Sequence, residues 1–395
     1  MGCCNKKRNP IIVDPFVSLS TNNTMMQPIL PNDSGIFRNS SNLSNNSSYL
    51  YNKRPSNTNT KKMKLSDFEI LKLLGKGTFG KVLLVKSKSP NDNNYYAMKI
   101  LQKKEVKKRK QEEHTKSERD LMVKLSSPFI LNIKFAFQDK DNLYLVSDFM
   151  QGGELSFHIN RLKFFNEEQC RFYAMEIILG IEAIHNINGV YRDLKPENIL
   201  LDKEGHIKLT DFGLSKILDK SGKAYTICGT MKYVAPDVFL NKGYGKEVDW
   251  WSLGCVMYFM LEGNPPFGNP KRENLDMNIY KKDLEFNKTK SESAKNIIRQ
   301  LLNTAPEKRL GYGVNGNQNV KRHPFFKGID WKKASRKEYK PKIVPVLEDN
   351  MDLKYFKKTY TNQNVSINQF KDDTNNSNEG DNYFNFTYTN QDYTG

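Results

Sequence analysis

Only the middle of this chain has the composition that a packed hydrophobic core requires. Residues 1–66 are rich in Asn and Ser and poor in aromatic residues, so they can bury little apolar surface and are expected to be disordered. Composition changes at Asp67-Phe68, where apolar alternation begins, and no long low-complexity stretch appears from there to about Phe326. Residues 327–395 are polar and Asn-rich again, but they carry aromatic clusters at 352–356 and 382–388. We therefore expect one folded domain, followed by a tail.

The folded segment divides into a β-rich part and a helical part. Runs of apolar and β-branched residues predict strands at 68–75, 81–87, 95–101 and 142–150. Helical spacing places Leu121, Met122 and Leu125 on one side of a helix over 113–125. Further helices are predicted at 154–162, 167–185, 248–261 and 293–303. The fold class is therefore α+β, with a small β-rich lobe at 67–150 and a larger helical lobe at 151–326.

The net charge favours an anionic partner. Lys and Arg number 62 against 44 Asp and Glu, which gives a net charge of +18. Nucleic acid, acidic lipid and phosphate-bearing ligands are all compatible with this charge. The basic residues are scattered in short clusters, such as Lys107-Lys108-Arg109-Lys110, and no nucleic-acid-binding motif accompanies them. We therefore expect no nucleic-acid partner.

Cysteine usage and hydropathy predict a cytoplasmic setting. The five cysteines are odd in number, and Cys170, Cys228 and Cys255 are widely separated, so no disulfide framework is expected. Reducing conditions fit this usage best. No apolar run approaches the ~18 residues that a membrane-spanning helix requires.

The N-terminal residues nevertheless suggest a lipid anchor. They read MGCCNKKR, in which Gly2 suits myristoylation and Cys3 and Cys4 suit palmitoylation, although Lys6 stands where Ser or Thr is usual. The alternative is an unmodified, disordered start. We expect acylation and a peripheral position on the cytoplasmic face of a membrane.

A glycine-rich motif lies between the first two predicted strands. Residues 75–82 read GKGTFGKV, a G-x-G-x-x-G-x-V pattern. Glycines let the backbone approach phosphate oxygens, and N–H groups on a tight turn suit anions. A dinucleotide site would need a helix after the glycines, whereas KVLLVKS predicts a strand. The motif therefore predicts a hairpin that covers phosphates.

Two charged residues follow the hairpin. Lys99 lies on the predicted strand YAMKIL, and Glu118 lies 19 residues further on, on the predicted helix. Either residue alone is more often a surface charge. After a glycine-rich hairpin they predict an ion pair in which the lysine binds the α- and β-phosphates of a nucleotide.

The next two motifs carry phosphoryl-transfer chemistry. Residues 190–202 read VYRDLKPENILLD and place Asp193, Lys195 and Asn198 in one short loop, and DFG follows with Asp211. Such a set provides a carboxylate for a hydroxyl proton, a lysine near the transferred group, and Asn and Asp ligands for Mg²⁺. Four motifs in this order are far more specific than any one alone.

With these motifs, the sequence resembles the eukaryotic protein kinases from about Phe68 to Phe326. More narrowly it is similar to the AGC group of Ser/Thr kinases, because Tyr191 precedes Arg-Asp and because VDWWSLG, RLG and HPFF follow. PKIVP and the FNFTY end resemble the C-terminal tail of that group, as in protein kinases B and C and the serum kinases. The resemblance implies a bilobal kinase fold with an AGC tail at 327–395, and ATP and Mg²⁺ as cofactors.

The resemblance also assigns the active-site residues. Asp193 would be the catalytic base, Lys195 would neutralise phosphate charge, and Asn198 and Asp211 would bind Mg²⁺. Asp148 to Met150 would form the hinge that binds adenine, and the small Ser147 would take the gatekeeper position. The ATP-binding residues implied are Leu74, Gly75, Lys76, Gly77, Thr78, Phe79, Gly80, Lys81, Val82, Ala97, Lys99, Glu118, Ser147, Asp148, Met150, Glu154, Leu200 and Asp211.

Substrate residues follow from the same resemblance. Glu154 and Glu197 match positions that meet Arg upstream of the phosphoacceptor, and Thr230 would support the catalytic residues. Phe259 takes a place that is usually acidic, so a requirement for Arg at position −3 is expected more firmly than one at −2. Met231-Lys232 replaces the usual Pro-Glu, so the pocket for the next substrate residue is expected to differ.

Two phosphorylation sites and an upstream activating kinase are implied as well. Thr226 lies in the activation segment KAYTICGTMKYVAPD, where its phosphate would pair with Arg192, Lys216 and His114. Thr387 lies in a hydrophobic motif formed by Tyr383, Phe386 and Tyr388. The tail raises one open question, because Met351 replaces the Phe that covers adenine in the group and either Tyr355 or Phe356 could substitute. Asp237 replaces a usual Glu and is expected to reach Arg309.

The leading hypothesis is a monomeric, active Ser/Thr protein kinase. The alternative is a kinase-fold scaffold, or pseudokinase, that binds partners without catalysis. The intact Asp193 and Asp211 favour the enzyme. A nucleic-acid-binding protein is a third option, which the charge alone supports.

Overall fold

The computed structural model describes residues 62–77, 80–240, 242–268, 277–287, 290–365, 383 and 385–390. They belong to one compact unit that spans Asn59–Gly395. Several predicted sites lie outside the described residues: Gly2, Cys3, Cys4, Thr78 and Phe79.

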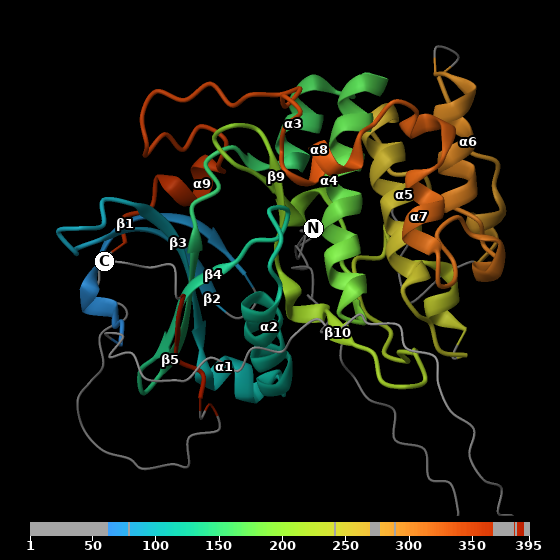
Figure 1. The fold of residues 1–395 in the computed structure, drawn as a ribbon. Coiled ribbons are helices and arrows are strands. Elements are labelled where there is room, and N and C mark those ends of the chain that lie inside the picture. The colour runs from blue at the N-terminus through green and yellow to red at the C-terminus, as the bar shows by residue number, and fades with distance from the viewer. Residues whose placement is uncertain are drawn as a thin grey trace, which may run out of the picture. The chain divides into compact units, whose positions relative to one another are not determined.

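The N-terminal lobe is an antiparallel sheet, and in Figure 1 its strands β1 to β5 lie together at one end of the ribbon. Among the described residues it has six strands in the order β1-β2-β3-β5-β4-β11. Their bounds are β1 (Phe68–Lys76), β2 (Gly80–Ser87), β3 (Tyr95–Gln102), β4 (Ile133–Gln138), β5 (Asn142–Asp148) and β11 (Tyr388–Thr389). The four predicted strands are confirmed, whereas β4 and β11 were not predicted.

Aromatic rings fill one face of this sheet. Phe68 and Phe137 stack with ring centroids 6.0 Å apart, and Phe137 and Tyr144 stack at 4.7 Å. Such offset ring pairs add to the burial of apolar area. Met63 is also buried in this cluster, so the packed chain begins before the predicted boundary at residue 67. On the other face lie the unpredicted short helix α1 (Lys103–Lys108) and the predicted helix α2 (Glu112–Lys124).

The C-terminal lobe is helical, as predicted. Its main helices are α3 (Leu155–Leu162), α4 (Glu167–Asn186), α5 (Glu247–Glu262), α6 (Glu292–Leu301), α7 (Gly316–Lys321) and α8 (Trp331–Ser335). Helix α4 begins at a capping box, in which the Asn166 side chain accepts the N–H of Gln169 at 2.8 Å and the Gln169 side chain accepts the N–H of Asn166 at 3.0 Å. Helix α5 is apolar on nearly all sides, which is why it lies at the centre of the lobe. None of the described helices is both long and apolar enough to cross a membrane.

Short strands and 3-10 helices make up the remaining regular structure. Most of them lie between the helices of the C-terminal lobe, next to the loops of the predicted site. The strands are β6 (Gly153–Glu154), β7 (Gly189–Val190), β8 (Ile199–Leu201), β9 (Ile207–Leu209) and β10 (Lys216–Ile217). The 3-10 helices are η1 (Leu65–Asp67), η2 (Pro196–Asn198), η3 (Phe212–Leu214), η4 (Pro236–Phe239), η6 (Met277–Lys281), η7 (Pro306–Lys308) and η8 (Pro324–Phe326). Strand β6 pairs with β8 and β8 with β9, and β7 pairs with β10.

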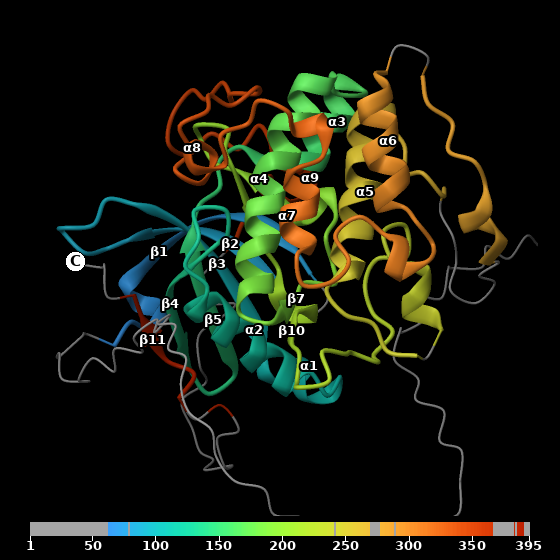
Figure 2. The ribbon, with the colours of Figure 1, turned by 45° about the vertical axis from the view of Figure 1, so that its right-hand side comes forward.

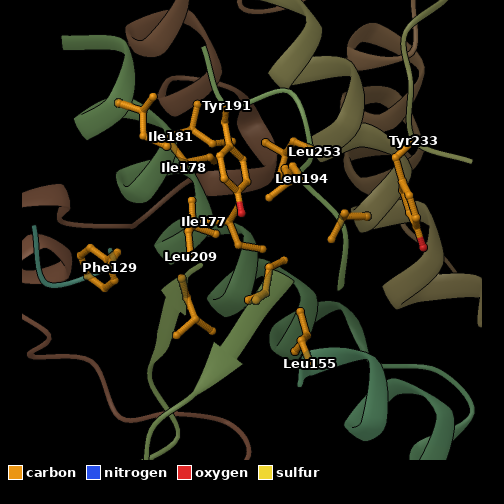
Figure 3. Packing of buried hydrophobic residues seen from close by; sticks show 14 of the residues in the cluster. Phe129, Leu155, Ile177, Ile178, Ile181, Tyr191, Leu194, Leu209, Tyr233 and Leu253 are labelled. Carbon is orange, nitrogen blue, oxygen red and sulfur yellow. The ribbon is translucent and has the colours of Figure 1, made fainter. Parts of the chain in front are cut away.

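The core of the C-terminal lobe lies directly under these loops. Figure 3 shows the fully buried ring of Tyr191 between Ile178 of α4 and Leu253 of α5. Tyr191 immediately precedes Arg192 and the predicted catalytic base Asp193. The loop therefore starts from a residue that packing holds in place.

The tail contacts both lobes. On the C-terminal lobe, the Lys337 ammonium lies 3.1 Å from the Asp202 carboxylate, and the Tyr173 hydroxyl donates to the carbonyl of Ile343 at 3.3 Å. Further along, helix α9 (Lys358–Thr361) packs against β1. Strand β11 then pairs antiparallel with β4, so the end of the tail completes the N-terminal sheet (Figure 2).

A buried ion pair fixes the end of the activation segment. The guanidinium of Arg309 lies 2.6 Å from the carboxylate of Asp237, and both side chains are almost fully buried. Arg309 also donates to the carbonyls of Asn303 and Glu247. The expectation that Asp237 reaches Arg309 is therefore confirmed.

We predict that Arg309→Met lowers the free energy of unfolding by about 3–5 kcal/mol, because it leaves the Asp237 carboxylate buried without its cation. Urea denaturation followed by circular dichroism measures the change. The matched control is Arg336→Met, since Arg336 pairs with Glu338 on the exposed surface. That control should change stability by less than about 1 kcal/mol, and equal losses in both variants would contradict the prediction.

Candidate active site

Three side chains donate hydrogen bonds to the Asp193 carboxylate. The ammonium of Lys195 donates to the Asp193 carboxylate at 2.7 Å, and the hydroxyl of Thr230 donates to its other oxygen at 2.8 Å. The amide of Asn198 donates to the same carboxylate at 2.9 Å and to the Asp193 carbonyl at 2.9 Å. Lys195 and Thr230 are themselves joined at 2.9 Å. These donors fix the direction in which the carboxylate points.

The loop that carries Asp193 is hydrogen-bonded to the side chain of Asp249 on α5. This carboxylate is fully buried and accepts the backbone N–H groups of Tyr191 and Arg192, both at 2.9 Å. It also lies 2.8 Å from the Nε2 atom of His185. Arg192 has φ +70°, a left-handed conformation that is unfavourable for a residue with a side chain. The hydrogen bonds to Asp249 hold the loop in that conformation.

Asp249 was missed in the sequence-based assignment of site residues. A usable signal was present, since Asp249 is the one charged residue in the run VDWWSLGCVMYFML. A carboxylate in an apolar helix must find buried hydrogen-bond donors, so this position indicates a structural role.

Lys99 joins three elements of the site. Its ammonium lies 2.7 Å from Glu118 of α2 and 3.3 Å from Asp211, which precedes η3. Burial opposes the lysine charge, but these two carboxylates outweigh it and raise the pKa of Lys99. The charge of Lys99 in turn lowers the pKa of Asp211, against the effect of burial. The predicted ion pair is therefore formed, and Asp211 joins it.

The glycine-rich segment forms the turn between β1 and β2. The N–H of Gly77 donates to the carbonyl of Gly80 at 2.9 Å. A Cβ atom on Gly80 would lie 1.7 Å from the carbonyl oxygen of Ile100, so only glycine lets β2 approach β3 here. Among the described residues, a Cβ atom on Gly75 or Gly77 would meet nothing within 4 Å, so these residues leave room for a ligand beside the two glycines.

Several predicted ATP-binding residues lie opposite one another on paired strands. Gly75 pairs with Val82 and Lys76 with Lys81, and Leu74 is buried beside them. Ala97 of β3 lies opposite Ser147 of β5. Glu154 lies opposite Leu200 in the β6–β8 pair. Residues that are far apart in sequence are thus brought to adjoining strands.

The side chain of Asp148, a predicted hinge residue, forms ion pairs with two lysines. Its carboxylate lies 3.3 Å from the ammonium of Lys134 and 3.2 Å from that of Lys208. Met150 is buried at the end of this segment, and its carbonyl accepts the N–H of Gly153 at 3.0 Å. Asp148 can therefore meet a ligand through its backbone rather than its carboxylate.

The oxygen atoms near Asp211 suit Mg²⁺. The amide nitrogen of Asn198 is engaged by Asp193, which leaves its carbonyl oxygen as a possible ligand. One oxygen of Asp211 contacts Lys99, while the side chain remains 50% exposed. Within the described part of the chain, no group of three or more acidic, His or Cys side chains could hold a metal by itself. Mg²⁺ in nucleotide enzymes is usually bound by one or two protein groups together with phosphates, so these residues fit it.

The predicted substrate carboxylates lie on separate elements. Glu154 begins α3 and accepts the Ser156 hydroxyl at 2.8 Å. Glu197 lies on η2, and its charge adds to the effect of burial in raising the pKa of Tyr233. Glu197 therefore lies close to the turn that follows Thr230. Phe259 is partly buried against the core.

Arg192 is connected to the activation segment through the Tyr244 hydroxyl. Its Nη1 atom donates to the Tyr244 hydroxyl at 3.3 Å, and that hydroxyl donates to the carbonyl of Thr226. Burial, together with the positive charge of Arg192, lowers the pKa of His114 on α2. Thr226 is exposed, and the third predicted partner, Lys216, is exposed on β10.

The aromatic motif of the tail binds α1 and α2. Tyr383 and Phe386 are buried, and the Tyr383 ring centroid lies 5.5 Å from the ammonium of Lys103. The Arg119 guanidinium lies 5.7 Å from the Phe386 ring centroid and donates to the carbonyl of Asn385 at 2.8 Å. Tyr388 lies in β11, and Thr387 beside it is exposed. The tail therefore contacts the helix that carries Glu118.

Of the two candidate tail residues, Phe356 is the one whose ring lies against the predicted hinge. Its ring stacks on the hinge residue Phe149 with centroids 5.5 Å apart. Tyr355 is instead buried against Phe157 of α3, and Met351 is exposed. Phe356 is thus the aromatic residue of this segment that lies beside the hinge.

Comparison with known proteins gives consistent matches. The family model of the protein kinase domain matches residues 68–326. A RAC family serine/threonine-protein kinase homolog of Dictyostelium discoideum is 42% identical over 310 residues, which cover 78% of this chain and 68% of that protein. Protein kinase 2 of the same organism is 44% identical over 297 residues, which cover 75% of this chain and 61% of that protein. Ribosomal protein S6 kinase alpha-1 of Homo sapiens is 43% identical over 301 residues, which cover 75% of this chain and 41% of that protein.

The chain spans less than two thirds of the latter two relatives. The relatives are serine/threonine kinases of the AGC type, so the resemblance drawn from the sequence motifs is confirmed. The predicted bilobal fold is confirmed as well.

Proposed function

This chain belongs to the protein kinase family, and we propose that it transfers the γ-phosphate of ATP to Ser and Thr hydroxyls of proteins that carry Arg upstream. The observation that carries the proposal is the convergence of Lys195, Asn198 and Thr230 on the Asp193 carboxylate. A scaffold without catalysis would have no use for this set of donors.

We assign ATP to the space beside the glycines of the β1–β2 hairpin and Mg²⁺ to the oxygens of Asn198 and Asp211. Lys99 binds the phosphates, and Glu118 holds its ammonium in place at 2.7 Å. When bound, Mg²⁺ supplies neutralisation of the charge on the phosphate oxygens. The backbone of Asp148–Met150 binds the adenine ring.

Asp193 orients the substrate hydroxyl and accepts its proton. Lys195, 2.7 Å from that carboxylate, places a positive charge where the phosphoryl group is transferred. Thr230 and Asn198 keep the carboxylate aimed at the hydroxyl. Glu154 and Glu197 bind the upstream Arg at position −3, because a guanidinium donates two parallel hydrogen bonds to a carboxylate.

We predict that Asp193→Asn lowers kcat by about 10²- to 10⁴-fold on an Arg-containing Ser peptide, since the amide cannot accept the proton. Transfer of labelled γ-phosphate measures the rate, and calorimetry should show that nucleotide binding is retained. The matched control is Asp219→Asn, which removes an exposed carboxylate of the activation segment. Equal rates in the wild type and Asp193→Asn would favour the scaffold. Loss of the −3 Arg should raise KM.

Phosphorylation of Thr226, carried out by an upstream kinase, is the proposed switch. Support comes from Arg192, which donates to the Tyr244 hydroxyl, because that hydroxyl in turn donates to the backbone carbonyl of the exposed Thr226. A phosphate there can form charge-assisted hydrogen bonds and order the loop that carries Thr230. Thr387, exposed beside the docked tail motif, is the second proposed phosphosite.

We expect Thr226→Ala to lower kcat/KM by about tenfold or more, because the loop then lacks the phosphate that orders it. The neighbouring substitution Tyr225→Phe removes an exposed hydroxyl one residue away and should have little effect. Peptide phosphorylation by protein treated with an activating kinase measures both. Full activity of Thr226→Ala would refute the switch.

We also propose a cytoplasmic chain attached to a membrane by acylation of Gly2, Cys3 and Cys4. One myristoyl chain binds membranes only at about 10⁴ M⁻¹, so the cysteines and the basic Lys6-Lys7-Arg8 provide the second signal. Gly2→Ala should move the protein from the membrane pellet to the supernatant. Asn5→Ala, which leaves the acylation residues intact, is the control. The anchor is refuted if both variants pellet equally.

A further inference from the structure

The residues that follow Thr230 form a turn directly beside the proposed catalytic base. The N–H of Tyr233 donates to the carbonyl of Thr230 at 2.8 Å, so Met231 and Lys232 occupy the two central positions of a β-turn. The Thr230 hydroxyl donates to Asp193 at 2.8 Å. One end of the turn is therefore tied to the reacting centre.

The other end of the turn is tied to the core. The Ser252 hydroxyl of α5 donates to the carbonyl of Tyr233 at 2.8 Å, and the Tyr233 side chain is buried. Met231 and Lys232 between these anchors are only partly buried. The backbone of the turn is fixed while its two central side chains reach solvent.

Lys232 presents a charge at this place that the described residues do not neutralise. Its ammonium makes no ion pair or hydrogen bond with any side chain in the part of the chain that the structure describes. By contrast, Lys195 in the same region is bound by Asp193 and Thr230. Even Glu197, close enough to influence Tyr233, does not pair with Lys232. An ammonium in this state favours an anion from a ligand.

The covalent reach of the chain places this charge near the phosphoacceptor. Two residues span at most about 7 Å, and the flexible lysine stem adds about 6 Å. The ammonium therefore lies within about 13 Å of the Asp193–Thr230 contact. An extended peptide rises about 3.3 Å per residue, so this distance corresponds to about four residues on either side of the acceptor.

We propose that Lys232 is a specificity-determining residue that selects an anionic side chain, a carboxylate or a phosphate, within about four positions of the phosphoacceptor. The inference rests on the proposed kinase activity. The preferred substrate then carries two opposite charges: an Arg that Glu154 and Glu197 bind, and an anion that Lys232 binds. A purely basic peptide would then be a poorer substrate than a mixed one.

The test is a positional scan on wild-type protein phosphorylated at Thr226. The parent peptide carries Arg at −3, Ser as acceptor and Ala elsewhere, and Asp, Glu or phosphoserine is placed at each remaining position from −4 to +4. We expect one position, or two adjacent ones, at which the anion raises kcat/KM about two- to fivefold, the size of one solvent-exposed ion pair. The gain should fall as salt is added. Comparison of Asp with phosphoserine separates carboxylate from phosphate selection.

Charge reversal identifies the residue responsible. Lys232→Glu should turn the gain at that position into a loss of similar size, and Lys232→Met should bring the ratio of the anionic to the Ala peptide close to one. The matched control is Lys220→Glu, which makes the same change of charge on an exposed part of the activation segment and should keep the wild-type ratio.

The possible outcomes separate this inference from the proposed function. Absence of transfer to every peptide would refute the kinase activity. Transfer to the parent peptide with no gain at any position would refute the role of Lys232 and leave the activity standing. A gain that survives in Lys232→Glu, or that is lost equally in Lys220→Glu, would also overturn the inference.

Discussion

The buried carboxylate of Asp249 is the constraint on which the reacting part of the molecule depends. A charge without access to water must be hydrogen-bonded, and here the donors are the backbone N–H groups of Tyr191 and Arg192. That requirement holds Arg192 in a left-handed conformation. Asp193 is thereby turned toward Lys195, Asn198 and Thr230. The rigid helix α5 thus positions a loop that has little regular structure of its own.

Helix α2 links the nucleotide side of the site to the tail. Glu118 holds Lys99, while Arg119, the next residue, contacts Phe386 and the carbonyl of Asn385. The same helix also packs against η3, which follows Asp211. One helix therefore contacts Lys99, the tail motif and the segment that follows Asp211. Any change in its position alters all three contacts together.

Much of this arrangement could be predicted from the sequence, and the exceptions have physical causes. Strands with several apolar residues close together and helices with a clear apolar spacing were recognised. Strand β4 was not, because it is buried on both faces and shows no alternation. Strand β11 has two residues and becomes a strand only by pairing with β4. The position of Asp249 in an apolar run indicated a structural role, but its partners could not be identified from the sequence, because the N–H groups of Tyr191 and Arg192 and the ring of His185 lie about 60 residues away along the chain.

The sequence by itself determined the family, the chemistry of the site and the order of its motifs, since glycines, carboxylates and lysines at those spacings serve phosphoryl transfer. Only the tertiary structure decided which of Tyr355 and Phe356 lies beside the hinge, and that Asp211 shares Lys99 with Glu118. It alone showed that Lys232 stands at the centre of an anchored turn. The reason is physical: spacing along a chain limits local geometry, whereas contacts between distant segments depend on how the whole core packs.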